Sequence, residues 1–118
     1  MKHNFRELKI WIESMFLVKI VYQCTKSLPL EEKFGLYSQI NRSVVSIPSN
    51  IAEGSGRSSE KEFIHFLNIA ISSSFELETQ LILISELFEV DILDCQKKVI
   101  EIQKMISVFK KSLNSSII

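Results

Sequence analysis

Two short stretches of the sequence hold residue types that could do chemistry. The first is EFIH, residues 62–65, which places a carboxylate and an imidazole three positions apart, on one face of a helix. Two such E-x-x-H patterns and two further glutamates build di-iron sites in helical bundles. Here the pattern occurs once, and the other histidine, His3, lies in the N-terminal tail. We therefore expect no metal site and interpret His65 as a residue on a helix surface.

The second stretch is AEGSGR, residues 52–57, which is similar to a phosphate-binding loop. It lacks the GK[ST] ending of a P-loop and the spacing of a G-x-G-x-x-G loop, and no strand precedes it. We expect Gly54 to end a helix instead, because glycine readily adopts the left-handed conformation at that position. The N-terminus of the next helix, with Arg57 nearby, could still hold an anion, and that alternative stays open.

Nucleophilic catalysis needs a serine or cysteine beside a base. His65 is the only internal histidine, and the sequence contains no G-x-S-x-G motif. Neither Cys24 nor Cys95 belongs to a C-x-x-C pair, so we interpret both as packing residues. These observations predict a protein that is not an enzyme and that uses no cofactor.

The spacing of apolar residues predicts four helices. The first is expected over about 5–26 and the second over about 30–53, while Ser59 and Asp91 are expected to cap the third and fourth. Short connections between such helices are typical of a bundle. The sequence therefore predicts an all-α fold, a single domain over residues 1–118 built as an antiparallel up-down four-helix bundle.

Each helix has a row of residues expected to face the core. The third and fourth rows alternate steps of three and four over several turns and are the clearest. The first helix is the least clear, because it has more apolar residues than one row needs. The expected rows are Phe5, Leu8, Ile12, Met15 and Tyr22; Tyr37, Ile40, Val44, Ile47 and Ile51; Phe63, Leu67, Ala70, Ser74, Leu77, Leu81, Ile84 and Phe88; and Ile92, Cys95, Val99, Ile102, Ile106, Phe109 and Leu113.

Pro48 is expected to lie inside the second helix rather than in a loop. The apolar row of that helix and a parallel polar row both pass through Pro48 without losing phase. Proline lacks an N–H, so the Val44 carbonyl loses its helical partner and the axis is expected to bend. The sequence thus predicts a proline-kinked second helix.

Polar residues on the second and third helices are expected to meet where Ala70–Ser74 forms a waist of mostly small side chains. We predict that they form a hydrogen-bonded network that fixes the register of the helices, with a ligand site as the alternative. The residues of this predicted polar network are Gln39, Arg42, Ser46, Asn50, Glu53, Arg57, Ser73 and Glu76.

Charge is unevenly distributed along a chain whose formal net charge is zero. Residues 1–26 are net +3 and residues 95–118 net +4, whereas residues 58–94 are net −7. No stretch is apolar for the roughly 20 residues that a membrane helix needs. The N-terminus also lacks the features of a signal peptide, so we expect a cytoplasmic protein with no membrane partner.

The stretches QINRSVVSIPSNIAEGSGR, residues 39–57, and FLNIAISSSFELETQL, residues 66–81, resemble the family of 23S rRNA intervening-sequence proteins. The resemblance covers nearly the whole chain, and SIPSNIAEG is highly specific. Ser72 stands where glycine is usual. Positions that fit the first-helix pattern are Phe5, Leu8, Trp11, Tyr22, Thr25 and Pro29, and the other matching positions are Gln39, Arg42, Ser46, Pro48, Asn50, Glu53, Gly54, Arg57, Ser73 and Glu76.

The resemblance implies an up-down bundle that assembles into a homopentameric ring. Genes of this family can lie within inserts in bacterial 23S rRNA genes. A related branch, the accessory variability protein of diversity-generating retroelements, binds nucleic acid. An apolar surplus on the first helix independently suggests an oligomer interface at Trp11, Phe16, Val18 and Ile20.

Two hypotheses for the function follow. The first is a non-enzymatic oligomer that binds RNA or DNA through basic helix faces, because the first and fourth helices are usually adjacent in such bundles and their charges could merge. The second is a scaffold that binds another protein and no nucleic acid. The residues expected to bind nucleic acid are Arg6, Lys9, Lys97, Lys98, Lys104, Lys110 and Lys111.

Overall fold

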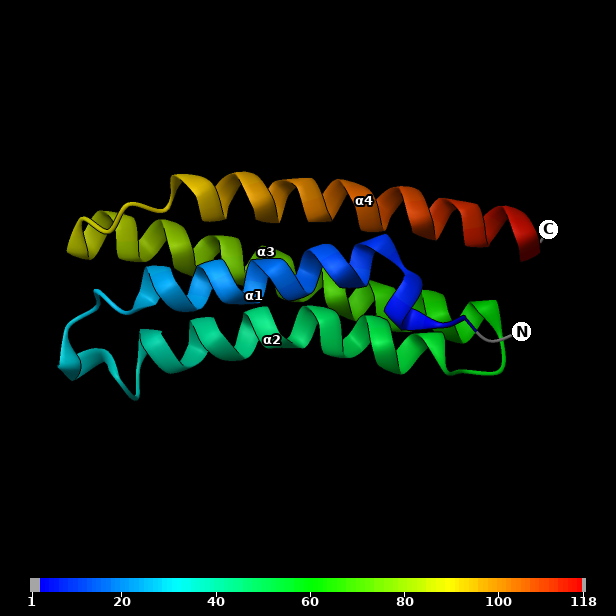
Figure 1. Ribbon diagram of the computed structural model, residues 1–118, viewed down its shortest axis with the longest axis horizontal. Coiled ribbons are helices and arrows are strands. Elements are labelled where there is room, and N and C mark those ends of the chain that lie inside the picture. The colour runs from blue at the N-terminus through cyan, green and yellow to red at the C-terminus, as the bar shows by residue number, and fades with distance from the viewer. Residues whose placement is uncertain (1–2, 118) are drawn as a thin grey trace.

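Four long helices lie side by side in the computed structural model (Figure 1), which describes residues 3–117 and the side chains of residues 3–115. The helices are α1 (Lys9–Thr25), α2 (Leu36–Ser55), α3 (Glu60–Phe88) and α4 (Leu93–Ile117). Two 3-10 turns, η1 (Phe5–Glu7) and η2 (Leu30–Glu32), precede α1 and α2. The described residues contain no strand, so the all-α expectation is confirmed.

The colour gradient of Figure 1 runs in opposite directions along successive helices. Both described chain ends therefore lie at the same end of the bundle. Within the described residues consecutive helices pack against one another, α1 also packs against α4, and α2 and α3 share the most extensive contact. The bundle measures 48 × 22 × 20 Å.

The core rows expected for α2, α3 and α4 are largely confirmed. Their members are buried, except that Tyr37 and Phe88 are only partly buried and Phe109 packs against the edge of the core. Ser59 caps α3 by accepting a hydrogen bond from the Glu62 N–H at 3.1 Å. Asp91 serves α4 in the same way, since its Oδ1 accepts from the Leu93 N–H at 3.1 Å.

The row expected for α1 is wrong. Ile12, Met15 and Tyr22 are exposed, and the buried row consists of Ile10, Ser14, Leu17, Val21 and Thr25. Two of these buried residues are hydroxyl side chains that bond to carbonyls of their own helix. Ser14 Oγ donates to the Ile10 carbonyl at 2.6 Å, and Thr25 Oγ1 donates to the Val21 carbonyl at 3.1 Å. Such bonds let a hydroxyl enter an apolar contact without an unmet polar group.

The bounds of α2 differ from the expected 30–53 at both ends. Gly35, with φ −105° and ψ −114°, leaves the helical region, so Leu30–Glu32 forms a separate turn and α2 begins at Leu36. At the other end the helix continues through Gly54 and Ser55 to a cap at Gly56. α2 is continuous through Pro48, as expected, while the bend itself stays a prediction.

Gly54 does not end α2 in a left-handed conformation, because no described glycine has a positive φ. Its function is steric. A Cβ on Gly54 would lie 2.8 Å from Phe63 Cδ1 and 2.8 Å from Phe66 Cβ, both on α3. The missing side chain lets α3 approach α2 closely just after the turn that joins them.

Candidate functional site

The predicted polar network lies along the contact between α2 and α3. At its centre the hydroxyls of Ser46 and Ser73 are hydrogen-bonded at 2.8 Å. Asn50 Nδ2 donates to the Ser46 carbonyl at 2.8 Å and to Ser46 Oγ at 2.9 Å. One turn earlier, Ser43 Oγ donates to Glu76 Oε1 at 3.0 Å. The bonds to Ser73 and Glu76 link α2 to α3, and Asn50 holds Ser46 in place within α2, which supports a structural function for this part of the network.

The remaining network residues lie at the edge of this contact. Arg57 pairs with Glu53 at 3.4 Å, and its guanidinium lies 4.6 Å from the centre of the Phe66 ring. Gln39 and Arg42 are exposed and bond to no other side chain within the described part of the chain. The structure therefore groups three of the eight residues tightly, namely Ser46, Asn50 and Ser73. Three others have one partner each, since Glu53 pairs with Arg57 and Glu76 accepts from Ser43. Gln39 and Arg42 remain at the surface.

Sequence reasoning missed several polar residues at helix contacts. Ser43 and Asn41 on α2 are buried, and Thr25 on α1 lies 3.5 Å from Asn41 Oδ1. Between α3 and α4, Gln103 donates to Glu78 at 2.9 Å. Their position beside the apolar row of each helix is the one feature of the sequence that could have indicated burial. A pattern that scores residues only as apolar or polar ignores that feature.

The predicted nucleic-acid residues lie on η1, α1 and α4, and α1 and α4 are neighbours as expected. Lys97, Lys104 and Lys111 are seven positions apart, which places them on one face of α4, and all three are exposed. Within the described residues none of the three forms an ion pair. We call these three residues the α4 lysine row.

The other predicted cations are partly engaged. Lys98 contacts Glu13 on α1 and lies 3.1 Å from Glu101, and Lys110 donates to Asn68 on α3 at 2.9 Å. Arg6 stacks on Phe5 at 4.5 Å, while Lys9 is exposed. The hydrogen bond from Lys98 holds the pKa of Glu13 below its ordinary value, and the same bond raises the pKa of Lys98. Lys98 therefore joins α1 to α4 more than it offers a free charge.

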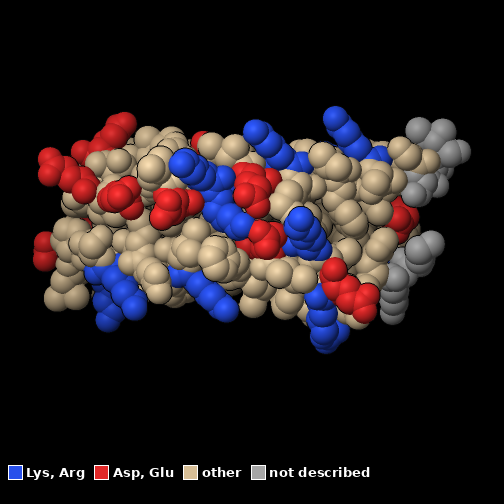
Figure 2. Space-filling model, turned by 45° about the horizontal axis from the view of Figure 1, so that its top comes forward, with Lys and Arg blue, Asp and Glu red and all other residues tan. Residues whose placement is uncertain are grey.

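Figure 2 shows the surface over α4, where lysines and arginines alternate with carboxylates. Carboxylates are most numerous at the left-hand end in this view, but others lie among the cations in the middle and toward the right. The basic surface is thus a row of separated charges and not a continuous patch.

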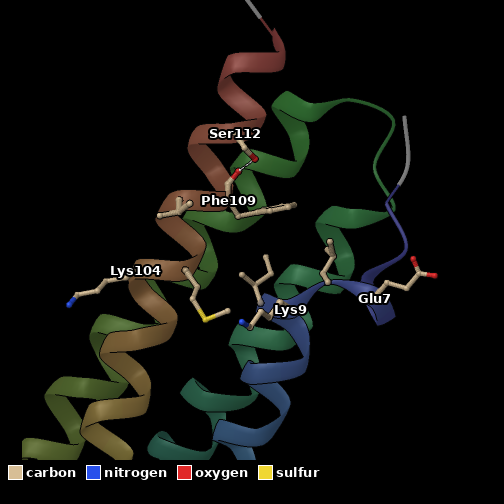
Figure 3. Close-up of a pocket in the computed structure, with 9 residues that line it drawn as sticks. Glu7, Lys9, Lys104, Phe109 and Ser112 are labelled. Atoms are coloured by element: carbon tan, nitrogen blue, oxygen red, sulfur yellow. Dashed lines mark hydrogen bonds between the residues drawn. The ribbon is translucent and has the colours of Figure 1, made fainter.

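An open groove of about 560 Å³ separates the start of α1 from the C-terminal half of α4 (Figure 3). Its walls are mostly apolar and include Leu8, Met105 and Phe109. Lys9 and Lys104 lie at its edges, and the Lys104 amino group points outward. The groove therefore adds Lys9 to the neighbourhood of the α4 lysine row.

The expected oligomer residues differ in exposure. Trp11, Val18 and Ile20 are partly buried against the core of the same chain, whereas Phe16 is 53% exposed. Further exposed apolar side chains lie beside Phe16 on α1 and along α3. They are Ile12, Met15 and Tyr22 on α1, and Ile69, Phe75, Ile82, Leu83 and Leu87 on α3.

No group of three or more His, Cys, Asp or Glu side chains within the described residues is arranged to hold a metal ion. His65 is exposed on α3. In the described part of the chain no helix is both long and apolar enough to cross a bilayer.

The model of one protein family, described as 23S rRNA-intervening sequence protein, matches residues 6–108. The chain belongs to this family. The match includes α1, α2, α3 and most of α4, and so contains the polar network and two members of the α4 lysine row. No curated protein sequence is significantly similar to the chain.

Proposed function

We propose that this member of the 23S rRNA-intervening sequence protein family is a self-associating, non-enzymatic bundle that binds the phosphate backbone of RNA or DNA through α4. The observation that carries the proposal is the α4 lysine row, whose three side chains are exposed and free of ion pairs in the described residues. A helix rises about 1.5 Å per residue, so the row extends over roughly 21 Å. That length faces about six phosphates of one strand, at roughly 3.4 Å per phosphate.

The charges favour backbone contacts over base readout. Lysine is a point charge on a flexible stem, which suits a phosphate more than the edge of a base. Glu101 lies between Lys97 and Lys104 on the same exposed face and weakens the local field. We therefore expect weak, salt-sensitive binding with little sequence preference, which repetition in an oligomer would strengthen.

Two exposed apolar surfaces support self-association. One lies on α1 around Phe16 and the other on α3 around Phe75, which is 54% exposed. α1 and α3 occupy diagonal corners of the bundle, since in the described residues each packs against α2 and α4. Two different surfaces on opposite sides suit a head-to-tail contact, and repeated contacts of that kind close into a ring. A homopentamer, which the family resemblance implies, has this geometry.

Light scattering at micromolar concentration tests self-association. We expect a mass several times that of one chain, and Phe16→Glu or Phe75→Glu should each lower it because each places a charge in an apolar contact. A wild-type mass of a single chain would refute this part of the proposal.

Charge reversal tests the nucleic-acid surface. The variant Lys97→Glu/Lys104→Glu/Lys111→Glu should lose binding to a single-stranded RNA and to a duplex DNA. The matched control, Lys19→Glu/Lys26→Glu/Lys61→Glu, changes net charge equally at exposed positions outside α4 and should retain most binding. Equal losses in both variants would show that only net charge matters. Binding by neither the variants nor the wild type would favour a protein-binding scaffold.

A further inference from the structure

The two cysteines of the chain meet where the end of α1 contacts the start of α4. Cys24 lies in the last turn of α1 and Cys95 in the first turn of α4. Cys24 Sγ reaches the Asp91 carbonyl at 3.6 Å, four residues before Cys95. Cys95 Sγ reaches the Ile20 carbonyl at 3.6 Å, four residues before Cys24. Each sulfur thus points across the contact to the turn that carries the other.

The surroundings of the two thiols differ. Cys24 is partly exposed, whereas Cys95 is buried. The neighbouring Cys95 side chain lowers the pKa of Cys24, whereas the neighbouring Cys24 side chain together with burial raises the pKa of Cys95. An oxidant in solution therefore meets Cys24 first, with Cys95 directly behind it.

We propose that Cys24 and Cys95 form an intramolecular disulfide when the protein meets a hydroperoxide. The Cys24 thiolate attacks the peroxide, whose O–O bond breaks, giving a sulfenic acid and one molecule of water or alcohol. The Cys95 sulfur then attacks Cys24 Sγ, the S–O bond breaks, and hydroxide leaves as water with the Cys95 proton. Two thiols lose two electrons in total, and the peroxide gains them.

Neighbouring charges set the expected speed of the reaction. The carboxylates of Asp91 and Asp94 lie near the pair and raise the pKa of Cys95, and Asp91 opposes thiolate formation at Cys24. We therefore expect a slow, stoichiometric modification that a dithiol reductant reverses, and not catalytic turnover.

The disulfide would join the end of α1 to the start of α4 around a loop of about 70 residues, which limits the unfolded chain more than the folded one. We expect oxidation to raise the melting temperature by about 10 °C, in a change that reductant abolishes. This effect is independent of the proposed nucleic-acid binding.

Intact-mass spectrometry after graded hydrogen peroxide treatment of the reduced, assembled protein tests the pair. Wild type should lose the mass of two hydrogens and remain a single covalent chain. Cys95→Ser should instead accumulate a sulfenic acid at Cys24 that dimedone traps, because the resolving thiol is missing. Cys24→Ser should stay reduced over the same period, since Cys95 is buried.

Three results would overturn the proposal. They are disulfide-linked dimers as the main product of wild type, dimedone trapping in wild type as complete as in Cys95→Ser, and disulfide formation no faster in folded protein than in urea. The urea comparison needs no variant, so it remains decisive even where a cysteine substitution destabilises the fold.

Discussion

At the scale of single residues, hydroxyl and glycine side chains decide how closely these helices pack. Ser14 and Thr25 enter the core of α1 because each bonds to a carbonyl of its own helix. The sequence pattern favoured Ile12 and Met15 instead, since a pattern that counts only apolar residues scores serine and threonine as surface. The rotation of α1 was therefore the part of the fold least predictable from the sequence.

Gly54→Ala should destabilise the protein although alanine favours helices. The added Cβ would lie 2.8 Å from two atoms of α3, one of which is Phe66 Cβ, an atom that cannot move without its backbone. Overpacking of this kind costs about 1–3 kcal/mol, against a gain in helix propensity of about 1 kcal/mol. Chemical denaturation should show a net loss in the free energy of unfolding.

Gly56→Ala is the matched control for this prediction. The nearest atom to its added Cβ is the Glu53 carbonyl oxygen at 3.8 Å, which is an ordinary contact. We expect no loss of stability there. Equal effects of the two substitutions would show that close approach at Gly54 is not needed.

The ion pair of Lys98 with Glu13 predicts a pH dependence. The pKa of Glu13 is lowered from its ordinary value of 4.5 in the folded protein, so the pair stabilises the fold above that pH. The stabilisation is lost as the pH falls through the lowered pKa. Glu13→Gln should cost about 0.5–1 kcal/mol at pH 7, and the difference from wild type should shrink at acid pH.

Glu101→Gln serves as the comparison, because Glu101 is half exposed and bonds to Lys98 from the same helix. Its removal should cost less than removal of Glu13. A difference between wild type and Glu13→Gln that stays constant as the pH falls well below 4.5 would contradict the assignment of the stabilisation to the ionised pair.

At the scale of the element, α2 carries the most informative local sequence. Apolar and polar rows that keep phase across Pro48 correctly predicted one continuous helix. Its ends were harder to predict, because Gly35 and Gly54 have opposite functions that residue type alone does not distinguish. Gly35 leaves the helical conformation, while Gly54 stays within it to admit α3.

Pro48→Ala should leave helical content unchanged or slightly higher by circular dichroism. The substitution restores an N–H that can bond to the Val44 carbonyl, and alanine is the better helix former. A fall in helical signal would show that Pro48 is needed to form α2. Loss of self-association with helical content intact would indicate instead that the bend shapes the subunit contact.

At the scale of the whole molecule, the bundle places cations from both ends of the chain on one side. That α1 and α4 are neighbours could be expected from helix count and short connections. That Lys98 pairs with Glu13 and so offers no free charge could not be expected, because this contact depends on how far each helix is rotated about its axis. Of the seven cations expected to bind nucleic acid, the structure most clearly favours the α4 lysine row, with Lys9 beside it across the groove.

The central claim is that this row binds phosphates, and the salt dependence of binding by the wild-type protein tests it most directly. Each phosphate contact on duplex DNA contributes about −0.9 to the slope of log K against log salt concentration. Three or four lysines therefore predict a slope of about −3 for each bound subunit. A titration of duplex DNA should give this slope, a titration of single-stranded RNA should give a shallower slope at about −0.7 per contact, and the charge-reversed α4 variant should bind neither. Absence of binding at low salt, or binding that is independent of salt, would contradict the account.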